Sequence, residues 1–204
     1  MTSEVEICNL ALDRIGGSEI QSLEDNTPEA RLCKRVYPRI RDRMLQVHPW
    51  KFATKRVKLV KTSNTPAHTF TTEFQLPTDY LKMILFNDFF VGRFIFFSGS
   101  ATDNFFGADL LFKREGDKIL TNDDVANLIY VFRETSTGNF DDTFVEVLAD
   151  RLAWRMAYPL TQSRTLTKDL RDEYNQNMQE ATAVNSQEDI EEVFENSTYL
   201  DARF

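Results

Sequence analysis

Two kinds of hydrophobic spacing divide this chain, and they constrain its fold more than any other feature of the sequence. Near both ends, apolar residues recur every four positions, as they do along one face of a helix. The clearest rows are Leu32, Val36, Ile40 and Met44, and Phe144, Leu148, Leu152 and Met156. From Lys51 onward, the middle of the chain instead has short apolar runs separated by turn residues, which is typical of strands.

The order of these segments predicts an α+β fold in which a β-rich lobe is inserted into a helical bundle. Each terminal helix has an apolar face that it cannot bury alone, so we expect the helices from the two ends to pack together. The bundle would comprise residues 1–50 and 141–185, and the lobe residues 51–140. Residues 186–204 are polar and acidic, and we expect them to form a flexible tail that orders on a partner.

Capping signals predict where the first two helices begin and end. Ser3 and Glu6 have the spacing of a capping box before a helix that reaches about residue 15. Gly16 follows that helix and suits the left-handed conformation that a helix C-terminus often needs. Thr27 and Pro28 are a good N-cap and a good first helical residue, so a second helix is expected to start there.

Prolines and polar residues give further expectations for the helices. Pro38 lies inside the second helix and is expected to kink it, because it cannot donate a backbone hydrogen bond. Pro159 is expected to end the third helix. Ser163 or Thr165 then opens a fourth helix, which we expect to fade near Val184.

Charge is strongly segregated along the chain, although the net charge is −8. Between Arg31 and Lys61 there are eleven lysines and arginines and one acid, whereas residues 187–204 contain six acids and one arginine. A chain polarised in this way is suited to steering partners or copies of itself into contact. We therefore expect a subunit-interface or channel-lining surface on the second helix, formed by Arg31, Lys34, Arg35, Arg39 and Arg43.

Motifs that carry enzyme chemistry are missing from the sequence. There is no phosphate-binding loop, dinucleotide fingerprint, nucleophile elbow or zinc motif. His48 and His68 share no ligand spacing with Cys8 and Cys33, and the cysteines are expected to be buried, reduced thiols. We expect no catalytic residue, metal or cofactor. The chain also lacks a long apolar run and a signal peptide, so we expect no membrane association and synthesis in the cytosol.

Besides a structural, partner-binding protein, two other classes of protein are compatible with the sequence. The basic segment 31–61 is compatible with a free-standing nucleic-acid-binding protein, although its aromatic residues lie on or near core faces. Adjacent carboxylates such as Asp123-Asp124 are compatible with a phage glycan hydrolase, but such pairs suit turns and caps better.

Several short motifs occur in a fixed order along most of the chain. They are Ile7-Cys8-Asn9-Leu10-Ala11-Leu12-Asp13-Arg14-Ile15-Gly16, Glu29-Ala30-Arg31-Leu32-Cys33, Tyr37-Pro38, His48-Pro49-Trp50-Lys51-Phe52-Ala53, Leu76-Pro77-Thr78-Asp79-Tyr80-Leu81, Phe144-Val145-Glu146-Val147-Leu148-Ala149 and Leu160-Thr161-Gln162-Ser163. In this order and spacing they resemble the tail tubular protein A family, the head-to-tail adaptors of short-tailed bacteriophages. The resemblance covers about residues 3–185.

The resemblance implies a structural protein of the virion tail, assembled in the host cytoplasm. Subunits of this family form a ring, typically of twelve, beneath the portal protein, where they extend the channel through which genomic DNA passes without sequence specificity. The ring supports the tail nozzle protein and often helps to attach tail fibres. Because its interface is incomplete, the isolated subunit is expected to be a monomer.

The resemblance also implies a role for the acidic C-terminal segment. In related adaptors this segment docks on the portal, and here the apolar residues expected to bind are Ile190, Val193, Phe194, Tyr199, Leu200 and Phe204. Separately, the excess of aromatic residues makes the phenylalanine-rich lobe, with the loop 98–104, the candidate surface toward the nozzle or the fibres; the alternative is that these aromatics are simply the small core of the lobe.

Overall fold

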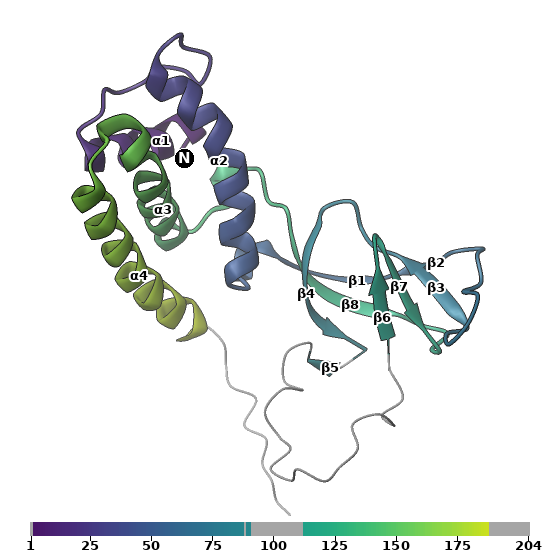
Figure 1. The fold of residues 1–204 in the computed structure, drawn as a ribbon. Helices are drawn as coiled ribbons and strands as arrows, with labels where there is room; N and C mark the ends of the chain where they lie inside the picture. The colour runs from purple at the N-terminus through teal and green to yellow at the C-terminus, as the bar shows by residue number, and fades with distance from the viewer. Residues whose placement is uncertain (1, 88, 91–111, 188–204) are drawn as a thin grey trace, which may run out of the picture.

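The computed structural model describes residues 2–87, 89–90 and 112–187, and in them it shows four long helices beside two antiparallel sheets (Figure 1). The expected α+β class is confirmed. The helices are α1 (Glu4–Ile15), α2 (Pro28–Val47), α3 (Asp142–Thr161) and α4 (Arg164–Gln187). All strands lie between α2 and α3 in the sequence, and the helices pack on one another beside the strands (Figure 1).

The starts of α1 and α2 follow from their capping residues, as predicted. Ser3 Oγ accepts a hydrogen bond from the backbone N–H of Glu6 at 3.1 Å, and the Glu6 carboxylate accepts from the N–H of Ser3. Gly16 ends α1 with φ 68°, a left-handed conformation that glycine adopts without steric cost. Thr27 Oγ1 accepts from the N–H of Ala30 at 3.1 Å. These local bonds satisfy donors that the first helical turn leaves without partners.

The expectation that Pro159 ends α3 is wrong. The helix continues to Thr161, and Gln162 closes it in a left-handed conformation, with its N–H donating to the carbonyl of Tyr158 at 2.9 Å. A proline removes only one intrahelical donor. At this exposed end of the helix water can satisfy the carbonyl that is left free, so the helix continues for two more residues. Pro38 lies inside α2, which is continuous from Pro28 to Val47, and the kink expected there stays a prediction.

The start of α4 is as predicted, and its end lies later than expected. Ser163 Oγ accepts from the N–H of Leu166 at 3.2 Å, which makes Ser163 the N-cap. The helix extends past Val184 to Gln187, so its last two residues belong to the segment expected to be the tail. Asn185 is buried and contacts His48 at the end of α2, which holds the last turn of α4 in place. Residues 188–204 lie outside the described residues.

The strands form two four-stranded antiparallel sheets. The first has the order β1 (Thr54–Lys58), β8 (Asn127–Phe132), β4 (Tyr80–Phe86) and β5 (Phe89–Phe90). The second has the order β2 (Val60–Lys61), β3 (Thr72–Gln75), β7 (Lys118–Thr121) and β6 (Phe112–Glu115).

The two sheets are joined where the chain passes directly from one to the other. Leu59 lies between β1 and β2, is buried, and donates its backbone N–H to the carbonyl of Ala126 at 2.8 Å. Ala126 in turn lies between β7 and β8. The two places where the chain passes between the sheets are thus hydrogen-bonded to each other. Both sheets therefore belong to one lobe.

An aromatic cluster packs where the helices meet the first sheet. Trp50 follows α2 and is 1% exposed, and its ring lies 5.1 Å from that of Phe144 on α3. Phe52 and Phe140 contact the same Phe144 ring at 5.0 and 4.9 Å. The Trp50 indole donates to the carbonyl of Met44 at 3.1 Å, so its polar atom is also satisfied. A continuous buried core therefore runs from the helices into the lobe.

Cys8 and Cys33 lie in the helical part of this core, and the expectation of buried free thiols is confirmed. Cys33 Sγ lies 3.6 Å from the sulfur of Met156 on α3. The hydrogen bond with Cys33 and burial raise the pKa of the Cys8 thiol, which keeps it protonated and unreactive.

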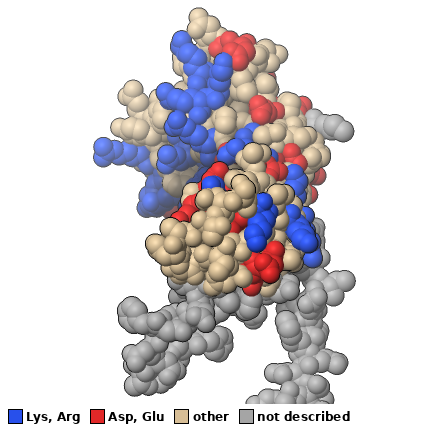
Figure 2. Space-filling model, turned by 90° about the vertical axis from the view of Figure 1, so that its right-hand side faces the viewer, with Lys and Arg blue, Asp and Glu red and all other residues tan. Residues whose placement is uncertain are grey.

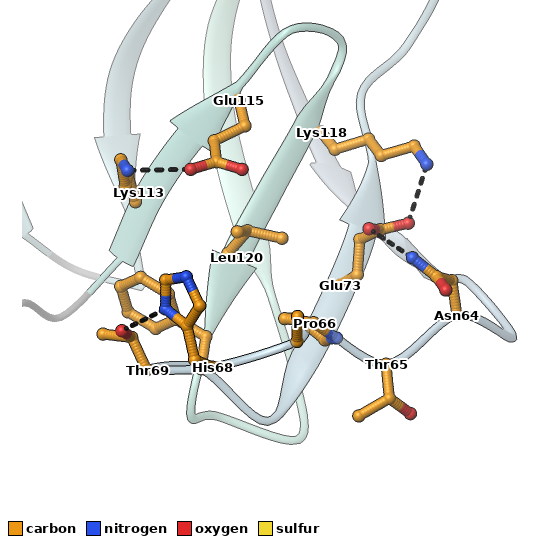
Figure 3. A pocket seen from close by; sticks show the side chains of 12 residues that line it. Asn64, Thr65, Pro66, His68, Thr69, Glu73, Lys113, Glu115, Lys118 and Leu120 are labelled. Carbon is orange, nitrogen blue, oxygen red and sulfur yellow. Dashed lines mark hydrogen bonds and ion pairs between the residues drawn. The ribbon is translucent and has the colours of Figure 1, made fainter.

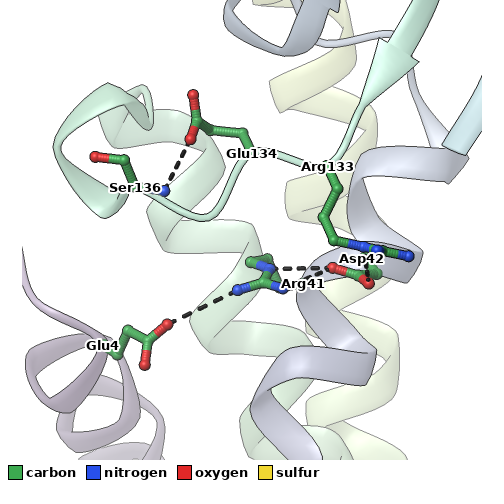
Figure 4. A network of polar contacts seen from close by, with 6 residues as sticks. All are labelled: Glu4, Arg41, Asp42, Arg133, Glu134 and Ser136. Carbon is green, nitrogen blue, oxygen red and sulfur yellow. Dashed lines mark hydrogen bonds and ion pairs between the residues drawn. The ribbon is translucent and has the colours of Figure 1, made fainter. Parts of the chain in front are cut away.

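A polar network ties the helices to the lobe (Figure 4). Asp42 on α2 accepts from Nε and Nη2 of its neighbour Arg41 at 3.1 and 2.9 Å, and from Nε of Arg133 at 2.8 Å. Arg133 directly follows β8, and the buried Arg41 also lies 3.8 Å from Glu4 on α1. One carboxylate therefore links α2 to the end of β8, an inner strand of the first sheet.

Candidate interaction surface

A groove between α2 and α3 gathers five arginines around an apolar floor. We call it the arginine groove. It has a volume of about 390 Å³ and is lined by Leu32, Arg35, Val36, Arg39, Ile40, Arg43, Arg151, Arg155 and Pro159. Figure 2 shows lysine and arginine side chains gathered along one side of the helical part.

The first wall of the groove is a row of exposed arginines on α2. Arg35, Arg39 and Arg43 recur every four residues, so they project from one side of the helix about 6 Å apart along its axis. Leu32 and Ile40 lie between them and the core, and both are buried. The charged heads thus stand at the edge of an apolar surface.

The second wall comes from α3, where Arg151 and Arg155 are also four residues apart. Arg151 Nη1 donates to the hydroxyl of Tyr174 on α4 at 2.7 Å, and its guanidinium lies 5.3 Å from the centre of the Tyr174 ring. The Arg155 guanidinium lies 5.9 Å from the Trp154 ring, which stacks on Tyr174. Aromatic neighbours position these two arginines without neutralising their charge.

Among the described residues, no carboxylate balances the positive charge of the arginine groove, and none of the residues that line it is an acid. None of its five arginines forms an ion pair with a carboxylate in residues 2–87 or 112–187. Like charges held together over a low-dielectric floor concentrate a positive potential, which attracts a negatively charged partner.

The structure brings together three of the five basic residues expected at an interface. Arg35, Arg39 and Arg43 line the arginine groove. Arg31 and Lys34 instead bond to the loop before α2: Arg31 donates to Asn26 at 3.1 Å, and Lys34 to Glu24 at 2.7 Å. A partner would have to displace these bonds, so Arg31 and Lys34 are less available than the other three.

Sequence reasoning missed Arg151 and Arg155. Their four-residue spacing beside the apolar rows of α3 was the available signal. That spacing shows that they share a face of the helix, but it does not show that the face adjoins α2.

A second hollow, of about 660 Å³, lies in the lobe beside β3, β6 and β7 (Figure 3). Two of its lining residues are acids, Glu73 and Glu115. Glu73 accepts from Thr62 at 2.8 Å and pairs with Lys118 at 2.9 Å, and Glu115 pairs with Lys113 at 2.8 Å. The hydrogen bond from Lys118, with that from Thr62, lowers the pKa of Glu73. A glycosidase needs a carboxyl group whose pKa is raised, and Glu73 has the opposite shift.

His48 also has structural partners. The Asn185 amide donates to Nε2 of His48 at 2.7 Å, and the imidazole packs edge-on against Trp50 at 5.0 Å. Burial, and then the charge of Lys82, lower the pKa of His48 and keep the ring neutral. These contacts join the ends of α2 and α4.

The remaining expected interaction sites lie on residues that the structure does not describe. They are the six residues expected to bind the portal, Ile190 to Phe204, and the loop 98–104. Within the described ranges, no three histidine, cysteine, aspartate or glutamate side chains are grouped to hold a metal ion. Nor does any described helix combine the length and apolar character that spanning a membrane requires.

Comparison with known proteins gives no match, either to a model of a protein family or to a curated protein.

Proposed function

We propose that this chain is a head-to-tail adaptor of a short-tailed bacteriophage, a structural subunit that forms a ring between the portal and the tail nozzle. The ring would extend the DNA channel and support fibre attachment. The ordered motifs along residues 3–185 support this proposal through their resemblance to the tail tubular protein A family.

The motif residues have structural roles that fit such a subunit. Asn9 of the first motif bonds through its side chain to both the N–H and the carbonyl of Ile20, each at 3.0 Å. Trp50 centres the aromatic cluster between helices and lobe. Asp79 accepts from Lys55 at 3.0 Å and from Tyr130 at 2.9 Å, which fixes the start of β4 against β1 and β8. These residues hold the helices and the lobe in one fixed arrangement, as a building block requires.

The arginine groove is the observation that carries the proposal. Its five arginines form no ion pair with a described carboxylate, so the groove offers a site for a negatively charged partner on a chain whose net charge is −8. Repetition around a ring would convert individually weak contacts of this kind into a stable assembly.

The acidic tail would supply the second contact in the assembly. Its ordering on the portal costs conformational entropy, which burial of Phe194, Tyr199 and Leu200 would offset. The subunit would then assemble on the portal and stay monomeric without it.

Electron microscopy of the chain, alone and mixed with portal rings from the same source, tests the proposal. We expect single subunits alone and a second ring stacked on the portal in the mixture. A chain truncated after Gln187 should not form that ring. The absence of any complex between the intact chain and the portal would contradict the adaptor function, and ring formation by the truncated chain would contradict the role of the tail.

A free-standing nucleic-acid-binding protein is the alternative that the arginine groove also favours. It requires that the isolated chain bind DNA with an affinity that falls as salt rises, and that Arg35→Ala and Arg39→Ala reduce this binding. For the glycan hydrolase alternative, hydrolysis of peptidoglycan that is lost on a single carboxylate substitution would be decisive.

A further inference from the structure

The exposed side of α1 carries an acidic hollow of about 490 Å³. It is lined by Thr2, Glu6, Asn9, Leu10, Asp13 and Glu19, which include three acids and no base. Leu10 lines the hollow and is 44% exposed, whereas Ile7, Ala11 and Ile15 on the other side of the helix are buried. The hollow therefore combines three acidic side chains with one exposed apolar side chain, that of Leu10.

We infer that the arginine groove of one copy of this chain receives the acidic face of α1 from a second copy. This inference deepens the proposed ring and rests on it, because it names the two surfaces that neighbouring subunits bring together.

The two surfaces match in charge. The arginine groove presents five arginines that pair with no carboxylate in the described part of the chain, and the acidic hollow presents Glu6, Asp13 and Glu19. Asp13 and Glu19 are exposed and form no ion pair with any described residue. Each surface supplies the countercharge that the other lacks, and such complementarity orients two proteins as they meet.

The two surfaces also match in spacing and apolar content. Glu6, Leu10 and Asp13 lie on one face of α1, and the two acids are about 10 Å apart along the helix axis. Arg35 and Arg43 are separated by about 12 Å along α2. When the acids align with the arginines, Leu10 lies over the apolar floor of the groove. In this contact the acids of α1 pair with the arginines at the rim, and Leu10 is buried at the centre.

The contact must form between copies. Within one chain, α1 packs against α3 and buries Ile7, Ala11 and Ile15, so its acidic face points away from the core. Because the groove and the hollow are different surfaces, each copy has one of each. Such heterologous contacts propagate from subunit to subunit, and they close into a ring when the rotation between subunits allows.

The floor of the arginine groove favours a protein over a nucleic acid as its partner. Val36, Ile40 and Pro159 offer apolar contacts that a phosphate backbone does not use. The net charge of −8 also opposes the approach of a polyanion to the rest of the molecule.

Cysteine cross-linking between two differently substituted copies tests the inference directly. One copy carries Arg39→Cys, the other Asp13→Cys, and they are mixed under mild oxidation. The native cysteines are fully buried and do not compete. We expect the 39–13 disulfide to exceed the yield of the control pair, Arg39→Cys with Lys168→Cys on α4. Equal yields in the two pairs, or predominance of the 39–39 disulfide, would overturn the inference.

Charge reversal supplies an independent measurement. The contact between copies is individually weak, so the chain is monomeric when dilute and associates only at high concentration. Sedimentation at high protein concentration and low salt would show this self-association about tenfold weaker in Arg39→Glu/Arg43→Glu. Adding Asp13→Arg/Glu19→Arg to the same chain should restore it. The matched control, Arg164→Glu/Lys168→Glu, makes the same charge change on α4 and should associate like the parent. No weakening in the first variant, or no restoration in the second, would count against the inference.

Two further outcomes separate this inference from its alternatives. If Arg39→Glu/Arg43→Glu keeps full self-association but no longer binds a single-stranded oligonucleotide, the groove is a nucleic-acid site and the inference fails. If the 39–13 cross-link forms but the intact chain does not bind the portal, the contact between copies stands and the adaptor function fails.

Discussion

Asp42 on α2 accepts a hydrogen bond at 2.8 Å from Arg133, a residue 91 positions further along the chain (Figure 4). The same carboxylate holds the buried guanidinium of Arg41, whose side chain is 8% exposed. Asp42 therefore carries the charge that balances two arginines at the joint between the helices and the lobe.

Asp42→Asn should destabilise the fold by about 2 kcal/mol, because a neutral amide cannot balance the buried charge of Arg41. Urea unfolding followed by circular dichroism measures the change. Asp172→Asn is the matched control: Arg171 donates to Asp172 from the neighbouring position in the same way, but both side chains are about half exposed. That control should change the free energy of unfolding by less than about 0.5 kcal/mol. Similar losses in both variants would show that the joint adds no stability.

Arg14→Met should cost about 3 kcal/mol, because it leaves the buried carboxylate of Asp150 without its cation. Asp150 is 1% exposed, contacts Arg14 and accepts from Asn177 at 2.8 Å, so it joins α1, α3 and α4. Adding Asp150→Leu to Arg14→Met should recover most of the loss, since an apolar pair can replace a buried ion pair. Thermal unfolding of the two variants decides this, and a double variant no more stable than Arg14→Met would contradict the explanation.

Trp50→Phe should destabilise the fold by about 3 kcal/mol, through lost packing and through the Met44 carbonyl that loses its indole donor. Trp154→Phe is the comparison, because that indole is half-buried and has no hydrogen-bond partner among the described residues. It should cost about 1 kcal/mol. Chemical unfolding gives both values, and equal effects would mean that the indole hydrogen bond contributes nothing.

Stability should fall as the pH drops below about 6.5, because burial and Lys82 lower the pKa of His48 below its ordinary value of 6.5. In that range the unfolded chain binds a proton that the folded chain does not. The loss levels off once the folded imidazole also protonates, at which point Nε2 no longer accepts the hydrogen bond from Asn185. Unfolding free energies of the parent and of His48→Gln, measured between about pH 5 and pH 8, test this. The variant should lack this part of the pH dependence, and an unchanged dependence would assign it to other groups.

Most helix starts, and the end of α1, follow from residues close by in the sequence. The capping box of Ser3 and Glu6, the left-handed Gly16 and the Thr27 cap form as predicted, because each depends on residues no more than four positions away. The change from helical to strand-like spacing likewise separated the helices from the sheets. The expectation for Pro159 failed, because whether a proline ends a helix depends on whether the carbonyl it frees can find another partner.

The surfaces of the molecule depend on how distant segments pack. The arginine groove requires α2 to pack beside α3, so that Arg39 and Arg155 face one space although 116 positions separate them in the sequence. The same packing left Arg31 and Lys34 to bond with the preceding loop, which periodicity along one helix cannot predict. Spacing tells which residues share a face of a helix. Only the packing of the core, through contacts between distant segments, determines what that face adjoins and which charges stay without a partner.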